Sequence, residues 1–151
     1  MSMRELTKAE IHTIYLSLLH LGVIHWTKSS KRMQLAMQYV VAREDLAGMP
    51  VIELYADIAK INHDKWQAVE RSLRVSLDSI WKNHTQECSQ LFFHSATPVK
   101  KPQMSQFLYL YKQEFGNGNI QRWNESIATP LDFEAAETVE DDGEHDDDAL
   151  R

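Results

Sequence analysis

Cysteine and glycine are scarce in this chain of 151 residues, and no long hydrophobic run is present. A single cysteine, Cys88, excludes a disulfide framework and a zinc site of four cysteines. The five glycines form no glycine-rich phosphate-binding loop, and no serine, cysteine or histidine lies in a recognisable nucleophile motif. No apolar stretch approaches the roughly 20 residues that a membrane-spanning helix requires. We therefore expect a protein of the reducing cytoplasm with no catalytic residues, no cofactor and no membrane partner.

Acidic and basic residues are unevenly divided along the chain, which has a net charge of -6. Residues 131–151 hold ten acidic residues against one arginine, a net charge of -9, whereas residues 1–130 hold 15 Lys+Arg and 12 Asp+Glu, a net charge of +3. The sequence thus predicts a mildly basic domain over residues 1–130 and an acidic, disordered tail over residues 131–151. The tail is either a solvated extension or a regulatory strip that competes with an acidic ligand for the basic domain.

Hydrophobic periodicity predicts an all-α fold of about six helices, with no strand and no internal repeat. Thr7 is expected to begin the first helix, with Glu10 at the spacing of a capping box and Gly22 at the helix end. Further helices are expected over residues 29–45, 51–60, 65–82, 103–115 and 120–127, with one or two helical turns over residues 86–93.

The apolar positions predict which side of each helix faces the core. In the segment 65–82 they form one stripe, and Trp66 and Trp81 near its two ends are both expected to be largely buried. Ile52 is expected to face inward from the preceding helix, and Asp64 to act as the N-cap of the next one. The other expected core residues of these three helices are Met33, Ala36, Met37, Val40, Val41, Tyr55, Ile58, Ala59, Val69, Leu73, Leu77 and Ile80.

The segments 51–60 and 65–82, separated by four residues, have the proportions of a helix-turn-helix. Within the second segment, Gln67, Arg71 and Arg74 are spaced so that they share one helical face. Such a row suits the DNA major groove, where arginine bonds guanine, glutamine suits adenine and glutamate accepts from cytosine. The alternative is a solvated face with a Glu70–Arg74 ion pair. The polar side chains opposite the apolar stripe are Gln67, Glu70, Arg71, Arg74 and Asp78.

Metal sites have weak support in this sequence. His84 and Cys88 stand four residues apart with His94 nearby, which is at most half of a zinc site. A surface histidine and an isolated buried thiol explain these residues more simply. The acidic tail lacks the ordered glycine and terminal glutamate of a calcium-binding loop. We expect no bound metal.

Two central segments carry a specific resemblance to a known family. The sequence LYADIAK (residues 54–60) is followed after eight residues by VERSLR (residues 69–74) and then by Trp81. This block resembles, without a gap, the C-terminal DNA-binding domain of the stage-zero sporulation protein A family, the response regulators that start endospore formation. The resemblance covers roughly residues 10–115. Other matching positions are Gly22, Val23, Lys28, Ala36, Leu46, Gly48, Leu91, Phe92, Lys101, Pro102, Ser105 and Phe107.

The resemblance implies a six-helix effector domain that binds a short DNA box, usually in tandem as a dimer, and controls transcription with RNA polymerase. It places Gln67, Glu70, Arg71 and Arg74 on the family's base-reading face and Lys28 at its backbone-contacting lysine. We also expect Lys65, at the start of the recognition helix, to contact the DNA backbone. Because Met1 leaves no room for a receiver domain, we expect the acidic tail to replace control from upstream.

Several positions depart from the family pattern. Ala68 stands where the family has a further arginine, and Val75 where it has a histidine. Ile24, Trp26 and Ser29 replace a proline, a histidine and a glycine. Fewer contacts argue for a changed or weaker DNA target.

Two hypotheses of function follow. The first is a sequence-specific, DNA-binding transcriptional regulator that lacks a receiver domain, with paired DNA sites and a homodimer on DNA. The second is a protein-interaction module that pairs with a full-length regulator without contacting DNA itself. The acidic tail and Ala68 favour the second, and the retained row of polar residues favours the first.

Overall fold

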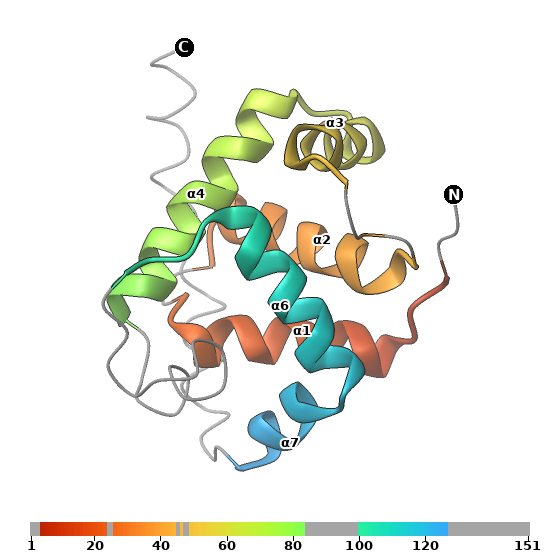
Figure 1. Cartoon of the computed structure of the whole chain (residues 1–151), viewed down its shortest axis with the longest axis vertical. Coiled ribbons are helices and arrows are strands. Elements are labelled where there is room, and N and C mark those ends of the chain that lie inside the picture. The colour runs from red at the N-terminus through yellow and green to blue at the C-terminus, as the bar shows by residue number, and fades with distance from the viewer. Residues whose placement is uncertain (1–3, 24–25, 45, 47–48, 84–99, 127–151) are drawn as a thin grey trace.

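The computed structural model describes residues 4–23, 26–44, 46, 49–83 and 100–126, and all regular secondary structure in these ranges is helical. This confirms the expected all-α fold. The predicted turns over residues 86–93, the candidate zinc ligands and the acidic tail lie outside the described residues. The helices are α1 (Lys8–Leu21), α2 (Lys28–Ala42), α3 (Val51–Asn62), α4 (Trp66–Asn83), α6 (Met104–Gly116) and α7 (Asn119–Ser126), as Figure 1 shows.

The two ends of α1 are set by the residues that the sequence indicated. The Glu10 backbone N–H donates to Thr7 Oγ1 at 3.1 Å, and the Thr7 backbone N–H donates to Glu10 Oε1 at 2.9 Å. Gly22 ends the helix with a φ of 125°, a conformation that other residues rarely adopt. A Cβ atom at Gly22 would also lie 3.0 Å from Asn83 Cβ. Glycine therefore allows the end of α1 to approach the end of α4 closely.

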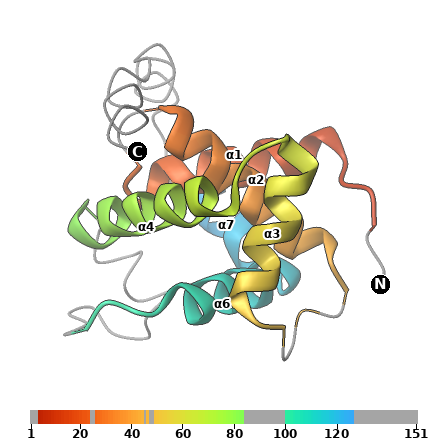
Figure 2. The same ribbon diagram turned by 90° about the horizontal axis from the view of Figure 1, so that it is seen from above.

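Helix α2 is the centre of the fold. It packs against α1, α3, α4 and α6, and Figures 1 and 2 show it surrounded by these helices. α3 lies at one end of the molecule, and α7 lies at the other end, against α1 and α6. The predicted inner face of α2 is confirmed, because Met33, Ala36, Met37, Val40 and Val41 are all buried.

Two expectations about α3 and its junction with α4 were wrong. Ile52 is 49% exposed, and the neighbouring Leu54 is buried in its place. Asp64 lies two residues before α4, which begins at Trp66, and its carboxylate accepts hydrogen bonds from Arg32. The inward positions of Tyr55, Ile58 and Ala59 are confirmed. The helix also extends two residues further than predicted, to Asn62.

Candidate nucleic-acid interface

The turn between α3 and α4 is three residues long and contains a left-handed residue. His63 has φ 56° and ψ 43°, and its N–H donates to Lys60 O at 3.4 Å. The next N–H, that of Asp64, donates to Ala59 O at 2.8 Å. These bonds use the last carbonyls of α3 and turn the chain sharply. Figure 2 shows α3 and α4 running in steeply different directions, as in a helix-turn-helix.

A buried arginine of α2 holds this turn and α4 together. Arg32 is 8% exposed, and its Nε and Nη2 atoms donate to the two carboxylate oxygens of Asp64 at 2.8 and 3.2 Å. Its Nη1 atom donates to Ser72 Oγ, on the buried face of α4, at 2.9 Å. One planar guanidinium group therefore connects the turn before α4 to the buried face of α4.

Further polar contacts fix α3 and α4 along their lengths. Tyr39 of α2 donates its hydroxyl hydrogen to Asp57 Oδ2 of α3 at 2.6 Å. Burial, with the Asp57 carboxylate beside it, raises the pKa of Tyr39 to about 12, so the hydroxyl remains a donor at neutral pH. On the other side, Ser76 donates to Ser29 O at 3.4 Å, and Ser79 donates to Gly22 O at 2.9 Å. Helix α4 is thus attached to α1, α2 and the turn before it.

The two faces of α4 match the predicted division. Its buried residues are Val69, Ser72, Leu73, Ser76, Leu77 and Ile80, which confirms four members of the predicted apolar stripe. The structure brings the four predicted base-reading residues onto the outward side of α4, with Gln67 and Arg74 exposed and Glu70 and Arg71 partly exposed. The remaining outward residues include Val75 and Asp78.

The outward polar side chains of α4 differ in their present partners. Arg74 donates from Nε and Nη2 to the two carboxylate oxygens of Glu70, at 3.1 and 3.3 Å. This is the ion pair of the alternative interpretation, and it raises the pKa of Arg74. Asp78 pairs with Lys101, which precedes α6. Arg71 makes no hydrogen bond or ion pair with any residue that the structure describes, so its guanidinium group has all its donors available.

The two tryptophans of α4 differ in burial. Trp66 is 42% exposed, so its predicted burial was wrong, whereas Trp81 is mostly buried, in agreement with the prediction. Trp66 is the first residue of α4, so no preceding helical turn covers it. Trp26, by contrast, is 7% exposed and packs edge-on against Tyr15, with ring centroids 4.8 Å apart. The tryptophan that replaces the family's histidine is therefore a core residue.

The two lysines expected to contact the DNA backbone are exposed and flank α4. Lys28 is the first residue of α2, and the adjacent Ser29 carbonyl accepts the hydrogen bond from Ser76 of α4. Lys65 directly precedes α4. A lysine at the N-terminus of α2 adds its charge to the positive end of the helix dipole, a combination suited to a phosphate group.

The functional residue that sequence analysis missed is Arg32. Lys31 beside it is exposed, but Arg32 lies on the same side of α2 as the buried Ala36 and Tyr39. Its role depends on Asp64 and Ser72, which lie 32 and 40 residues further along the chain. An arginine inside the apolar face of a predicted helix is a signal, but it does not identify the partner residues.

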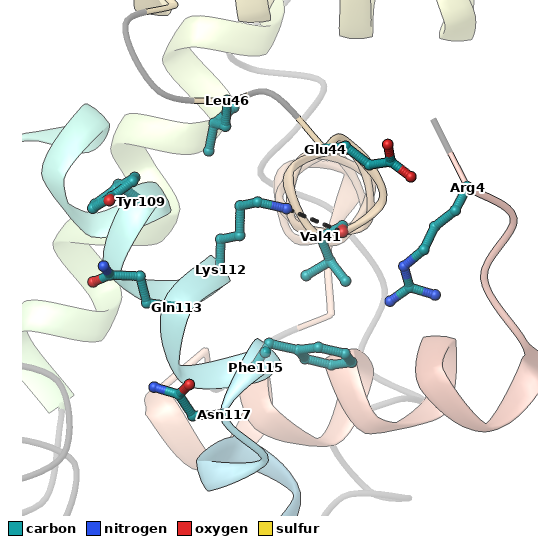
Figure 3. Close-up of a pocket in the computed structure, with 10 residues that line it drawn as sticks. Arg4, Val41, Glu44, Leu46, Tyr109, Lys112, Gln113, Phe115 and Asn117 are labelled. Atoms are coloured by element: carbon teal, nitrogen blue, oxygen red, sulfur yellow. Dashed lines mark hydrogen bonds between the residues drawn. The ribbon is translucent and has the colours of Figure 1, made fainter. Parts of the chain in front are cut away.

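The pocket in Figure 3 has a volume of about 590 Å³, and the charged lysine in its wall is already occupied by contacts within the protein. Lys112 of α6 lies in its wall, and burial and the nearby charge of Arg4 lower the pKa of this lysine. Its Nζ atom donates to the carbonyls of Val40, Val41 and Arg43 at the end of α2. The three ammonium hydrogens are therefore already used to cap α2. No cluster of three metal-ligating side chains occurs among the described residues.

Comparisons with known proteins assign the chain to a family. Neither the curated proteins nor the solved structures contain a significant match. No helix in the described ranges is long and apolar enough to cross a membrane. The family model "Sporulation initiation factor Spo0A C terminal" matches residues 14–115, which is most of the helical region. The chain therefore belongs to the Spo0A C-terminal family, a family of DNA-binding effector domains.

Proposed function

We propose that this protein is a sequence-specific regulator of transcription that places α4 in the major groove of double-stranded DNA. Gln67, Glu70, Arg71 and Arg74 are the base-reading residues of this proposal. Membership of a DNA-binding effector family supports the general activity. The fine assignment is supported by the arrangement of α4, whose one face is buried and whose other face carries the polar row.

The observation that carries the proposal is that α4 is held firmly by polar contacts, whereas Arg71 on its outward side has no polar partner among the described residues. α4 is anchored by Arg32, by the Ser76–Ser29 bond and by the Ser79–Gly22 bond. Arg71, on its outward side, has no polar partner in the described part of the chain. A rigid element that presents free donors loses little conformational entropy on binding. The backbone of α4 is therefore held in place before binding, and Arg71 has its donors available for guanine O6 and N7.

Arg74 and Glu70 act as a pair in this proposal. Their bidentate ion pair is partly exposed, so it contributes little to stability in the free protein. On DNA, the pair can orient Arg74 toward a base, or it can open so that Glu70 accepts a hydrogen bond from cytosine N4. Gln67, one turn before Arg71, suits an adenine.

The backbone contacts and the wider assembly belong to the same proposal. Lys28 and Lys65 contact phosphates on either side of the groove that α4 occupies, and they position the helix without reading sequence. Paired DNA sites, a homodimer on DNA and a contact with RNA polymerase follow from the family resemblance. The expected location is the cytoplasm, where the DNA of such a regulator lies.

The first prediction concerns Arg71. After selection of a preferred site from random oligonucleotides, Arg71→Ala should weaken binding to that site by about 1–3 kcal/mol and relax the preference at one guanine. Arg122→Ala is the matched control, because Arg122 is an exposed arginine on α7, at the far end of the molecule from α3. Gel shifts with both variants measure the effect. If Arg71→Ala stays folded by circular dichroism and selects the same motif at the same affinity, α4 is not the recognition helix.

The second prediction concerns Lys28. Lys28→Ala should weaken binding to all DNA sequences alike and lower the slope of log K against log salt by about one, because one phosphate contact is lost. Lys8→Ala is the control, since Lys8 is likewise the exposed first residue of a helix, α1. A salt titration with the selected DNA and with unrelated DNA measures both slopes. Equal slopes for wild type and Lys28→Ala would show that Lys28 does not contact a DNA phosphate.

One observation favours the alternative, a protein-interaction module. Leu35 and Ile61 are exposed apolar side chains beside a pocket of about 360 Å³ between α1, α2 and α3. The selection experiment separates the two functions. A folded protein that retains no DNA of any sequence at low salt would favour the interaction module and exclude the regulator.

A further inference from the structure

An apolar side chain stands exposed in the middle of the recognition face. Val75 is 42% exposed, although it lies between charged residues on α4. Among the described residues, α4 exposes only one other large hydrophobic side chain, Trp66, and that residue is at the helix end. Val75 is central, so its exposure is not caused by the end of the helix.

Helix geometry places Val75 directly beside Arg71. At 3.6 residues per turn, a residue four positions later is rotated by about 40° around the axis. Arg74, three positions after Arg71, is rotated by about 60° in the opposite sense. Val75 and Arg74 therefore flank Arg71 on its two sides. Ala68, three positions before Arg71, lies on the same side of Arg71 as Val75. On that side of the helix, Arg71 is therefore bordered by two short apolar side chains.

The major groove offers one apolar group to such a side chain, the C5 methyl of thymine. Guanine and adenine would place donors or acceptors against Val75, which would lose hydrogen bonds to water without replacement, and cytosine has only a hydrogen atom where thymine has the methyl group. The two α-carbons are about 6 Å apart along the helix, and base pairs are about 3.4 Å apart. The base that meets Val75 therefore lies one or two base pairs from the one that meets Arg71.

We infer that Val75 is a specificity-determining residue that recognises a thymine methyl one or two base pairs from the guanine bound by Arg71. This inference rests on the proposed function, because it requires α4 to occupy the major groove. It also explains the two departures from the family pattern on α4. Ala68 and Val75 convert one side of the recognition helix from polar contacts to an apolar contact, so the preferred DNA box is changed at that position.

The test removes the thymine methyl and nothing else. Each thymine of the selected site is replaced singly by deoxyuridine, and dissociation constants are measured by fluorescence anisotropy with the full chain. One replacement, within two base pairs of the guanine that Arg71→Ala no longer prefers, should weaken wild-type binding about threefold to fivefold, the effect of one buried methyl group. The same replacement should leave binding by Val75→Ala unchanged.

The controls distinguish a failure of the inference about Val75 from a failure of the proposed DNA-binding function. Leu35→Ala truncates an exposed apolar side chain on α2, so it should retain the full difference between thymine and deoxyuridine. Val75→Ala should also keep the guanine preference, because Arg71 is intact. If Val75→Ala shows the same thymine–deoxyuridine difference as wild type while Arg71→Ala relaxes the guanine, only the inference about Val75 is overturned. If wild type selects no site at all, both are overturned.

Discussion

At the scale of single residues, Arg32 has the largest structural role in the candidate interface. Three of its nitrogen atoms donate to Asp64 and Ser72, and the side chain is nearly excluded from solvent. A buried charge is tolerated because each of these donors has an acceptor. Removal of one partner leaves the other without compensation, which is more unfavourable than loss of the pair.

The third prediction follows from this arrangement. Arg32→Ala should lower the free energy of unfolding by about 3–5 kcal/mol, because Asp64 loses its counter-ion and Ser72 its donor. Asp64→Asn should also be strongly destabilising, because it leaves the nearly buried guanidinium group of Arg32 without a counter-ion and places an amide N–H2 group against one of its donors. Urea unfolding followed by circular dichroism measures both. A denaturation midpoint for Arg32→Ala equal to that of wild type would show that this network does not stabilise the turn.

The two apolar residues whose burial was predicted incorrectly share a cause. Trp66 and Ile52 are apolar residues in the first turns of their helices, and both are exposed. Periodicity predicts the direction in which a side chain points. Burial also requires that another helix covers that turn of the helix. In the middle of α4, where other helices cover it, the same periodicity was correct for Val69, Leu73 and Leu77.

At the scale of elements, local signals predicted the helices and their faces. The capping box at Thr7, the glycine at position 22 and the stripe of α4 depend on neighbouring residues in the sequence, so one sequence was sufficient. The outward row of α4 was predicted for the same reason. Contacts between distant segments were not predicted, because the partners of Arg32 and Tyr39 become neighbours only in the folded chain.

Helix α7 supplies the fourth prediction, because it is attached to α1 through a histidine. His20 Nδ1 lies 2.8 Å from Asn124 Oδ1, and Asn124 donates to Thr13 O at 3.0 Å. The His20 ring also packs edge-on against Trp123. Burial lowers the pKa of His20, although the bond to Asn124 acts in the opposite direction. The neutral imidazole is therefore the form that the folded state favours.

Stability should depend on pH accordingly. Because the folded pKa of His20 lies below the unfolded value of about 6.5, the unfolded state binds more protons in this range. The free energy of unfolding should thus decrease as the pH falls from about 6.5 through the folded pKa. His20→Gln should show a flatter decrease, whereas His12→Gln, at an exposed position of α1, should follow wild type. Urea titrations between pH 7.5 and 5 at intervals of about half a unit measure the three curves. Parallel curves for all three proteins would exclude His20 as the source.

At the scale of the whole molecule, charge is the dominant property. Residues 1–130 carry +3, and residues 131–151 carry -9, so the whole chain is acidic although residues 1–130 are mildly basic. A tethered segment of this length has an effective concentration on the order of millimolar at the rest of the chain. We therefore expect its carboxylates to compete with DNA phosphates for Lys28, Lys65 and the arginines of α4. Each such contact is weak and is screened beyond about 8 Å at physiological salt.

The fifth prediction tests this competition. Deletion of residues 131–151 should tighten binding to non-specific DNA severalfold at low salt, because the competing carboxylates are removed, and the difference should shrink as salt rises. Binding to the selected site should change less, since the proposed base contacts by Arg71 and Arg74 depend on hydrogen bonds that a tail carboxylate does not replace. A full-length variant with the ten acidic residues changed to Asn or Gln is the matched control, and it should behave like the deletion if charge is the cause. If the three proteins bind non-specific DNA equally across the salt titration, the tail does not compete for the basic face. Loss of a pulled-down partner on deletion, with DNA affinity unchanged, would instead assign the tail to protein recruitment.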